Sequence, residues 1–289
     1  MDIKKGLLDL YNEMQYTGQR LTQGWRFGRT SILPGGWPIM MGISFPKSGT
    51  NLLRQVLAAY ARVAPLADRS FDVFAAYNAE TGKASTIEDA MRFLAALRPG
   101  DIAAAHFFAW PEVAKEVCGK RYITFFIYRD PRDVVVSHVF YVTKMAPEHS
   151  HHQYYAEVLQ NFDERLKTSI LGRTDVHDFP DIRRRFEPYL AWLDHPEVLS
   201  LRYEDLILDR QGSLGKVYEH VARRLELPVS HDEMVSLMEK SISPEKSPTF
   251  RSGRTGEWNE HFSEDHKKLF KDVSGDLLIK LGYESGYEW

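Results

Sequence analysis

The sequence has little cysteine and no long apolar run. Its single cysteine, Cys118, cannot form a disulfide within the chain, which excludes a disulfide-stapled fold and favours a reducing compartment. No apolar stretch approaches the roughly 20 residues that a membrane-spanning helix needs, and the first residues lack a hydrophobic signal core. We therefore expect a cytoplasmic protein without an integral membrane segment.

Neither sign of charge predominates. The chain has 37 Lys and Arg residues against 40 Asp and Glu, so its formal net charge is −3. This balance argues against a polyanion-binding surface spread over the whole protein, and we expect no nucleic-acid partner. Basic residues must therefore act at local sites.

Repeats, low-complexity linkers and long charge runs are also absent, which favours one compact domain over two small ones. Strand-like segments alternate with helical patterns. This predicts an α/β domain with a central parallel sheet flanked by helices on both faces. The strands are expected near 39–45, 102–106, 122–128 and 198–202, and the helices near 51–63, 132–143, 153–171, 181–193, 213–225 and 263–281.

The first 37 residues are less regular than the domain expected at 38–289. A short amphipathic helix is indicated there by Leu7, Leu8, Leu10, Tyr11 and Met14. We expect this N-terminal arm to pack on the domain, although contact with a membrane surface or a partner remains open.

The most informative segment is residues 45–50, Phe-Pro-Lys-Ser-Gly-Thr, between an apolar run and a helical pattern. A strand, a tight turn and a helix start meet there. The unpaired N–H groups of a first helical turn and the helix dipole favour an anion, and Lys47 adds a full positive charge. The pattern G-x-x-x-x-G-K-[ST] is not matched, because Lys47 precedes Gly49. A solvated turn that caps a helix is the alternative.

Two further segments are suited to phosphate. The strand-like run 122–128 is followed by Arg129 and, further along a predicted helix, by Ser137. Residues 250–258 form a basic loop that contains glycine. Three segments suited to phosphate in one chain are more than chance would give.

In the order and spacing of these segments the chain resembles the sulfotransferases that use 3′-phosphoadenosine 5′-phosphosulfate (PAPS), particularly the cytosolic type and its bacterial relatives. The resemblance extends from about residue 38 to the end. It implies a P-loop-like domain, PAPS as donor, 3′,5′-ADP as product and no required metal. It also implies the donor-binding residues: Lys47, Ser48, Gly49 and Thr50 at the 5′-phosphosulfate, Arg129, Ser137, Arg251, Ser252 and Gly253 at the 3′-phosphate, and Tyr203 on the adenine side.

The chemistry of such a transfer can be argued from the residues. A departing sulfuryl group leaves negative charge on a phosphate oxygen, so a fixed cation beside it stabilises the transition state, and Lys47 is the candidate. The attacking hydroxyl needs a base that titrates near neutrality. His106 ends a strand-like run and would lie at the carboxyl edge of the sheet, where ligands bind. The family's catalytic histidine follows a comparable strand, so we predict His106 as general base.

The chain departs from the family pattern in several places. Many relatives have Thr-Trp after the loop, where this chain has Asn51 and Leu52, so we expect an apolar contact to the adenine instead of a ring stack. Ala104 stands where many relatives have a lysine. The family's dimerisation motif has no clear match in residues 259–266, so the oligomeric state is not predicted.

Histidines at 149, 151 and 152 invite a metal-site hypothesis. No partner ligands at zinc spacing accompany them, and the segment lies where a polar loop is expected. We predict no metal there.

The acceptor is the least defined feature. Phe107 and Phe108 directly follow His106, and together with Tyr141 they are our candidates for the acceptor pocket. A small hydrophobic alcohol or phenol fits these side chains better than a long polysaccharide, which would need an extended basic groove.

Two other classes of function remain open. A nucleotide-dependent small-molecule kinase would use Lys47 on a polyphosphate, but no acidic partner for magnesium is evident at a neighbouring strand end. A catalytically silent 3′,5′-ADP-binding protein would bind the nucleotide without changing any acceptor, and the absent tryptophan and lysine favour it slightly.

Overall fold

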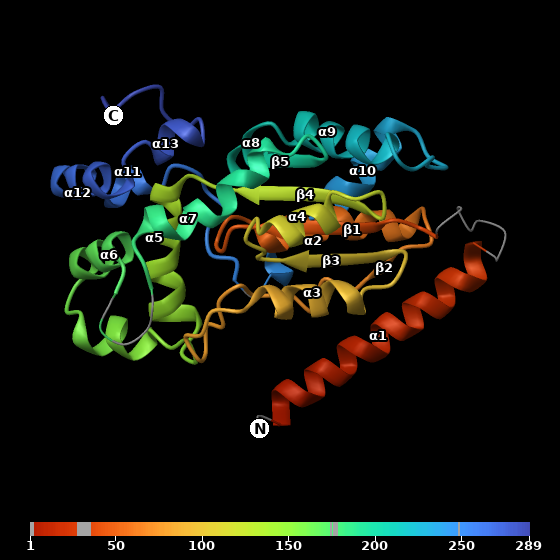
Figure 1. Ribbon diagram of the computed structural model, residues 1–289, viewed down its shortest axis with the longest axis horizontal. Coiled ribbons are helices and arrows are strands. Elements are labelled where there is room, and N and C mark those ends of the chain that lie inside the picture. Colours follow the sequence, from red (N-terminus) through yellow and green to blue (C-terminus); the bar gives the residue numbers. More distant parts are fainter. Residues whose placement is uncertain (1–2, 28–35, 174, 176–178, 248) are drawn as a thin grey trace.

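The centre of the protein is a five-stranded parallel sheet with the strand order β2-β3-β1-β4-β5 (Figure 1). The structure is a computed structural model that describes residues 3–27, 36–173, 175, 179–247 and 249–289. The strands are β1 (Ile39–Ser44), β2 (Ala67–Asp68), β3 (Asp101–Ala105), β4 (Tyr122–Tyr128) and β5 (Val198–Arg202). The predicted parallel sheet is thus confirmed, with the two-residue strand β2 added at one edge.

Helices connect the strands and extend the chain beyond them. They are α1 (Ile3–Phe27), α2 (Thr50–Ala58), α3 (Ile87–Ala96), α4 (Pro111–Val117), α5 (Pro131–Phe140), α6 (Phe162–Leu171), α7 (Ile182–Leu190), α8 (Tyr203–Leu208), α9 (Arg210–Ala222), α10 (His231–Ser241), α11 (Trp258–His261), α12 (Glu264–Ser274) and α13 (Leu277–Lys280). Shorter turns of 3-10 type are η2 (Ala59–Arg62), η5 (Ala191–Asp194) and η6 (Pro244–Lys246), and those of π type are η3 (Tyr141–Met145) and η4 (Tyr154–Val158).

The core has two parts, one on each face of the sheet. Successive strand residues point to opposite faces, so Met41 of β1 and Phe126 of β4 enter one cluster while Met40 and Phe125 enter the other. The first cluster includes side chains from α3 to α7, α12 and α13, and the second includes side chains from α2, α8, α9 and α10. Helices therefore cover both faces, as the sequence predicts. This explains why every residue of β4 is buried and nearly all of them are apolar or aromatic.

The strand order places a topological switch point at β1. From β1 the chain first adds β2 and β3 on one side and then β4 and β5 on the other. Because all strands are parallel, the segments that follow β1, β3, β4 and β5 leave the sheet at the same edge. This edge of an open parallel sheet is where ligands bind.

Two predicted helices are interrupted. The pattern at 153–171 predicts one helix, but the π turn η4 ends near Leu159 and α6 begins afresh, with the Asn161 side chain accepting a hydrogen bond from the Glu164 backbone N–H at 2.9 Å. This side-chain cap provides a hydrogen-bond acceptor for a free backbone N–H in the first turn of the new helix. The pattern at 263–281 is divided at Gly275, whose positive φ of 54° ends α12.

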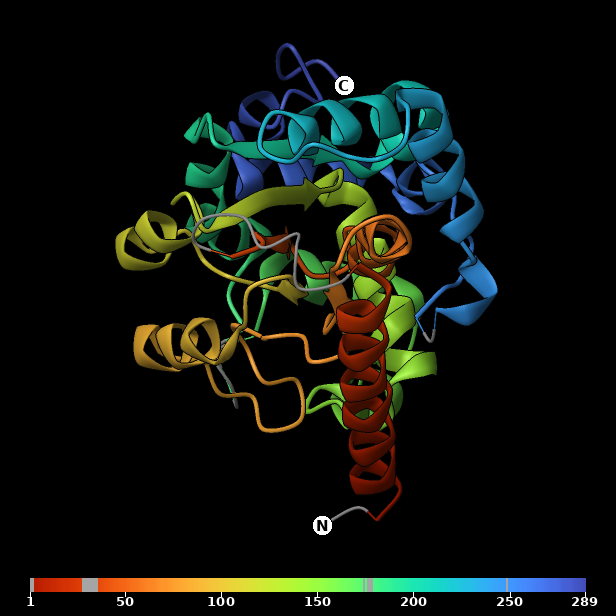
Figure 2. The same ribbon diagram turned by 90° about the vertical axis from the view of Figure 1, so that its right-hand side faces the viewer.

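The N-terminal arm contains α1, which is longer than predicted and contacts β2. This helix runs along the outside of the molecule towards the N-terminus (Figure 2). Its contacts with the domain are largely polar. The Tyr16 hydroxyl donates to Asp101 at 2.7 Å, and Arg20 pairs with the same carboxylate at 2.8 Å. The apolar side chains that marked this helix in the sequence are turned to solvent instead, namely Leu7, Leu10, Tyr11 and Met14. None of the described helices combines the length and apolar character needed to cross a membrane.

Candidate active site

The turn between β1 and α2 has an unusual backbone that requires glycine at one position. Lys47 has a φ of 68° and Gly49 a φ of 97°, both in the left-handed region. A Cβ on Gly49 would lie 2.6 Å from a ring atom of Tyr203, which follows β5. Any larger residue would push the loop off this ring, so Gly49 lets the loop and Tyr203 pack together.

Ser44, the last residue of β1, joins this loop to His106. Its hydroxyl lies 2.8 Å from the Thr50 hydroxyl and 3.1 Å from Nδ1 of His106. The His106 Nδ1–H donates to the Ser44 carbonyl oxygen at 2.8 Å. A carbonyl only accepts, so the proton of the neutral ring resides on Nδ1, and Nε2 carries the lone pair.

The surroundings of His106 favour its neutral form. Burial lowers the pKa of His106, the hydrogen bond to Ser44 raises it in part, and the charge of Lys47 lowers it further. The net effect is a pKa below the ordinary histidine value. At neutral pH, His106 is therefore a base ready to accept a proton.

Lys47 lies among other cations and against an aromatic ring. Its Nζ is 3.7 Å from the centre of the Tyr141 ring. Burial lowers the pKa of Lys47 to about 7, and the charges of Arg129 and Arg251 contribute. An anion bound among these three cations would stabilise the ammonium form and raise this pKa again.

Arg129 follows β4 and links the sheet edge to the C-terminal loop. Its NH2 donates to Asp133 at 3.0 Å and to the carbonyl oxygen of Arg254 at 2.8 Å. Its guanidinium carbon lies 4.6 Å from the centre of the Tyr203 ring. Arg129 and Gly49 therefore contact the same residue, Tyr203. The Lys47 loop and the segment after β4, both predicted to bind phosphate, are thus adjacent.

The C-terminal loop is held over α5 by two buried carboxylates. Asp133 accepts backbone hydrogen bonds from Gly256 and Trp258, each at 2.9 Å. Glu257 is 2% exposed and pairs with Arg251 and, at 3.1 Å, with Arg254. These contacts bring Arg251 close enough to Lys47 for its charge to lower the pKa of that lysine.

Asn51, at the start of α2, connects to the segment that precedes this loop. Its amide nitrogen donates to the Ser247 and Thr249 hydroxyls, each at 2.9 Å, and its oxygen accepts from Arg54 at 2.9 Å. Leu52 is partly buried and packs against the second core cluster. Asn51 therefore joins α2 to residues 247 and 249. The sequence, which placed Asn51 beside the adenine, did not indicate this contact.

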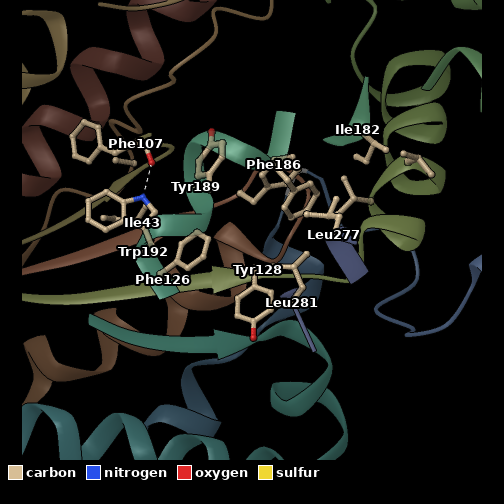
Figure 3. Close-up of a cluster of buried hydrophobic side chains, with 14 of the residues drawn as sticks. Ile43, Phe107, Phe126, Tyr128, Ile182, Phe186, Tyr189, Trp192, Leu277 and Leu281 are labelled. Carbon is tan, nitrogen blue, oxygen red and sulfur yellow. Dashed lines mark hydrogen bonds between the residues drawn. The ribbon is translucent and has the colours of Figure 1, made fainter. Parts of the chain in front are cut away.

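Three other predicted site residues, Ser137, Phe107 and Phe108, differ in how far their side chains are buried. Ser137 is partly exposed on α5, whereas Phe107 is fully buried and packs against Phe74 and Phe93. The carbonyl oxygen of Phe107 accepts a hydrogen bond from the Trp192 ring N–H at 2.9 Å (Figure 3). Phe107 therefore belongs to the first core cluster, and its assignment to the acceptor pocket stays a prediction. Phe108 is only partly buried and packs against the rings of Trp110 and Tyr189.

Sequence reasoning missed three residues of this arrangement: Ser44, Asp133 and Glu257. Ser44 immediately precedes the loop at 45–50, and Asp133 lies one helical turn after Arg129. Glu257 lies within the third basic segment. The position of Asp133, one helical turn after Arg129, could have identified it from the sequence. A buried guanidinium needs a counter-charge when its ligand is absent.

These residues fit a ligand with two anionic groups. The buried Ser48 hydroxyl and the buried Nε of Arg129 have no hydrogen-bond partner among the described residues. Both are polar groups whose burial is costly unless a ligand or water satisfies them. The Lys47 loop fits one anionic group, and Arg129 with Arg251 fits a second.

Comparison with known proteins agrees with this geometry. The family model described as the sulfotransferase domain matches residues 39–282. The chain is 25% identical over 277 residues to sulfotransferase 2A2 of Rattus norvegicus, covering 86% of each protein. It is 24% identical over 267 residues to sulfotransferase 2A1 of Homo sapiens, covering 83% of this chain and 85% of the relative.

Solved structures share the fold. Mouse sulfotransferase SULT7A1, solved with PAP, superimposes with a TM-score of 0.55 at 18% identity and covers 86% of each chain. Retinol dehydratase, solved with retinol and PAP, gives a TM-score of 0.56 at 17% identity and covers 85% of this chain and 82% of the other. Together with the family match, the converging loops show that the chain belongs to the sulfotransferase family and is a PAPS-dependent sulfotransferase.

Proposed function

We propose that this enzyme transfers the sulfuryl group of PAPS to the hydroxyl of a small, hydrophobic alcohol or phenol, with His106 as general base. The observation that carries the proposal is the hydrogen bond from His106 Nδ1 to the Ser44 carbonyl, at the end of the strand that leads to Lys47. This bond sets the tautomer that a base requires and joins it to the anion loop.

The donor would be held at both ends. PAPS supplies an activated sulfuryl group with a phosphate as its leaving group. The Lys47 loop fits the 5′ end, the Arg129 region the 3′-phosphate, and Tyr203 with Leu52 the adenine side. The proposed donor residues are Lys47, Ser48, Gly49, Thr50, Asn51, Leu52, Arg129, Ser137, Tyr203, Arg251, Ser252 and Gly253.

Lys47 and His106 then have complementary roles. Lys47 in its ammonium form neutralises charge that develops on the leaving oxygen. Nε2 of His106 accepts the proton of the attacking hydroxyl, and the Ser44 carbonyl stabilises the imidazolium that results. The Lys47 charge that lowers the pKa of His106 is offset when the anionic donor is bound, which makes Nε2 a stronger base in the complex.

The choice of a hydrophobic acceptor is supported by the side chains near this base. Phe108 and Tyr141 are partly buried and pack against the first core cluster. Among the relatives is a 3-beta-hydroxysteroid sulfotransferase of Cavia porcellus, 23% identical over 269 residues. An alcohol of similar apolar character would bury its carbon skeleton against such residues.

Transfer of labelled sulfuryl from PAPS to a panel of steroid alcohols, fatty alcohols and phenols tests this proposal. We expect transfer to at least one apolar acceptor in the presence of a metal chelator. Tight binding of 3′,5′-ADP without transfer to any hydroxyl would overturn the reaction, and magnesium-dependent turnover of ATP would assign a kinase instead.

A further inference from the structure

A surface cavity lies between α4 and η5, away from the loops that form the proposed donor site. Its volume is about 540 Å³, and its lining includes Ala109, Ala114, Lys115, Cys118, His195 and Glu197. Cys118 caps the C-terminal end of α4 before β4 begins, and the segment from His195 to Glu197 leads into β5. The polar end of the cavity is therefore at the edge where these strands start, opposite to the active site.

Three side chains of different chemistry converge there. The Cys118 sulfur, a ring nitrogen of His195 and a carboxylate oxygen of Glu197 all lie within 4.8 Å of one another. A tetrahedral zinc centre with bonds of roughly 2.0–2.3 Å separates its ligand atoms by roughly 3.3–3.8 Å. A shift of about 1 Å closes the difference, and Glu197 is exposed and can change rotamer.

These groups are not engaged elsewhere. Among the described residues, neither the imidazole of His195 nor the carboxylate of Glu197 has a hydrogen bond or an ion pair. The His195 ring contacts Trp192, with their centres 5.7 Å apart, and this contact limits its movement. The arrangement thus offers one sulfur, one nitrogen and one oxygen ligand that no other residue uses.

We propose that Cys118, His195 and Glu197 bind a zinc ion at a site that does not take part in sulfuryl transfer. A thiolate with an imidazole suits zinc, whereas calcium and magnesium prefer oxygen ligands alone. Three protein ligands leave a fourth position, which faces the cavity and is open to water or a small ligand. The ion would tie the end of α4 to the start of β5.

The Cys118 thiol must lose its proton to bind zinc. Burial and the charge of Glu197 raise the pKa of Cys118 to about 11. The unligated thiol is therefore protonated and is a poor nucleophile. Zinc replaces the S–H bond by a Zn–S bond, the proton passes to solvent, and no oxidant or reductant is needed.

Cobalt(II) binding gives the sharpest test, because the chain has a single cysteine. A cobalt–thiolate absorption band can arise only from Cys118. We expect one equivalent of cobalt to produce this band in the untagged 289-residue chain, and zinc to displace it. The band should be lost in Cys118→Ser. His195→Ala should weaken zinc binding by about 100-fold or more, since outer partners of metal ligands alone contribute 10–100-fold.

Matched controls separate this site from other ligands on the protein. His231→Ala removes a half-exposed histidine of α10, and Lys115→Ala alters the same cavity without removing a ligand. Both should leave zinc affinity unchanged. Absence of the cobalt–thiolate band in the wild-type protein would overturn the proposal, as would unchanged zinc affinity in His195→Ala.

Thiol labelling provides a second readout that does not need the cysteine variant to fold. Zinc should slow the labelling of Cys118 by at least about tenfold in the wild-type protein and not in His195→Ala. Equal labelling rates with and without zinc would contradict the site. A loss of sulfuryl transfer on chelation would overturn its separation from catalysis.

Discussion

The two ends of the proposed donor site are held by different kinds of interaction. At the Lys47 end, Ser44, Thr50 and His106 are joined by short hydrogen bonds among residues at strand ends and a helix start. At the other end, the C-terminal loop is held through the carboxylates of Asp133 and Glu257. The first end is set by the sheet itself, and the second by ion pairs between distant segments.

The two kinds of contact should respond differently to salt. Hydrogen bonds anchored in a buried sheet hold the proposed base, His106, in a fixed position, as catalysis would require. Ion pairs with partly exposed partners are weakened by salt, and Arg254 is 56% exposed. We therefore expect the contacts of the loop end to be weakened more by added salt than those of the Lys47 end.

The strongest test of the rigid end is His106→Ala. Loss of the base should lower kcat by about 10²–10⁴-fold, while the affinity for 3′,5′-ADP changes by less than about twofold. Steady-state kinetics and calorimetric titration measure the two quantities. The control is His231→Ala, which should affect neither. An equal loss of both quantities in His106→Ala would show a structural role for this residue.

Replacement of Lys47 tests the cation at the same end. Lys47→Met should lower kcat by about 10²–10³-fold, the cost of removing one stabilising donor. The pH dependence is a sharper signature, because the pKa of Lys47 is lowered to about 7 in the free protein. Below pH 7 the ammonium is present, and above it the anion must bind with uptake of a proton.

The affinity for 3′,5′-ADP should therefore fall between pH 7 and pH 9, by up to about tenfold per pH unit. Lys47→Arg keeps a charge at all these pH values and should flatten the profile. Calorimetry in buffers of different ionisation enthalpy measures the proton uptake directly. A wild-type profile that matches Lys47→Arg would contradict the lowered pKa.

Arg129→Ala tests the loop end and its selectivity. A charge-assisted hydrogen bond contributes about 1.5–3 kcal/mol, so the preference for 3′,5′-ADP over 5′-AMP should fall by about 10–150-fold. Competition binding of the two nucleotides gives this ratio. Arg92→Ala removes an exposed arginine of α3 and should leave it unchanged. If Arg129→Ala weakened the binding of both nucleotides equally, the assignment of Arg129 to the 3′-phosphate would be wrong.

The smallest effect is expected where the two ends are tied together. Asn51→Ala removes hydrogen bonds to Ser247 and Thr249, and should weaken 3′,5′-ADP binding by about 3–10-fold with little change in kcat. A double-mutant cycle with Thr249→Val separates this tie from a direct contact with adenine. Additive losses would mean that Asn51 acts on the nucleotide independently of Thr249.

The strands could be predicted from local sequence patterns better than the helix ends or the contacts of the N-terminal arm. Apolar runs marked β1, β3, β4 and β5, and the residues just after them were therefore predicted to share one edge. Helix ends were less predictable, because a side-chain cap at Asn161 divides a pattern that reads as continuous. The arm was expected to pack on the domain, but the sequence did not indicate that α1 would contact it through Tyr16 and Arg20.

By itself, the sequence determined the parallel sheet, the turn between β1 and α2 that carries Lys47, and the place of His106 after β3, because strand and turn preferences depend on neighbouring residues. Only the tertiary structure decided which distant groups meet. It turned Phe107 into the core, set Asp133 and Glu257 beneath the C-terminal loop, and brought Cys118 beside His195. Such encounters depend on how whole faces pack, and no local spacing specifies them.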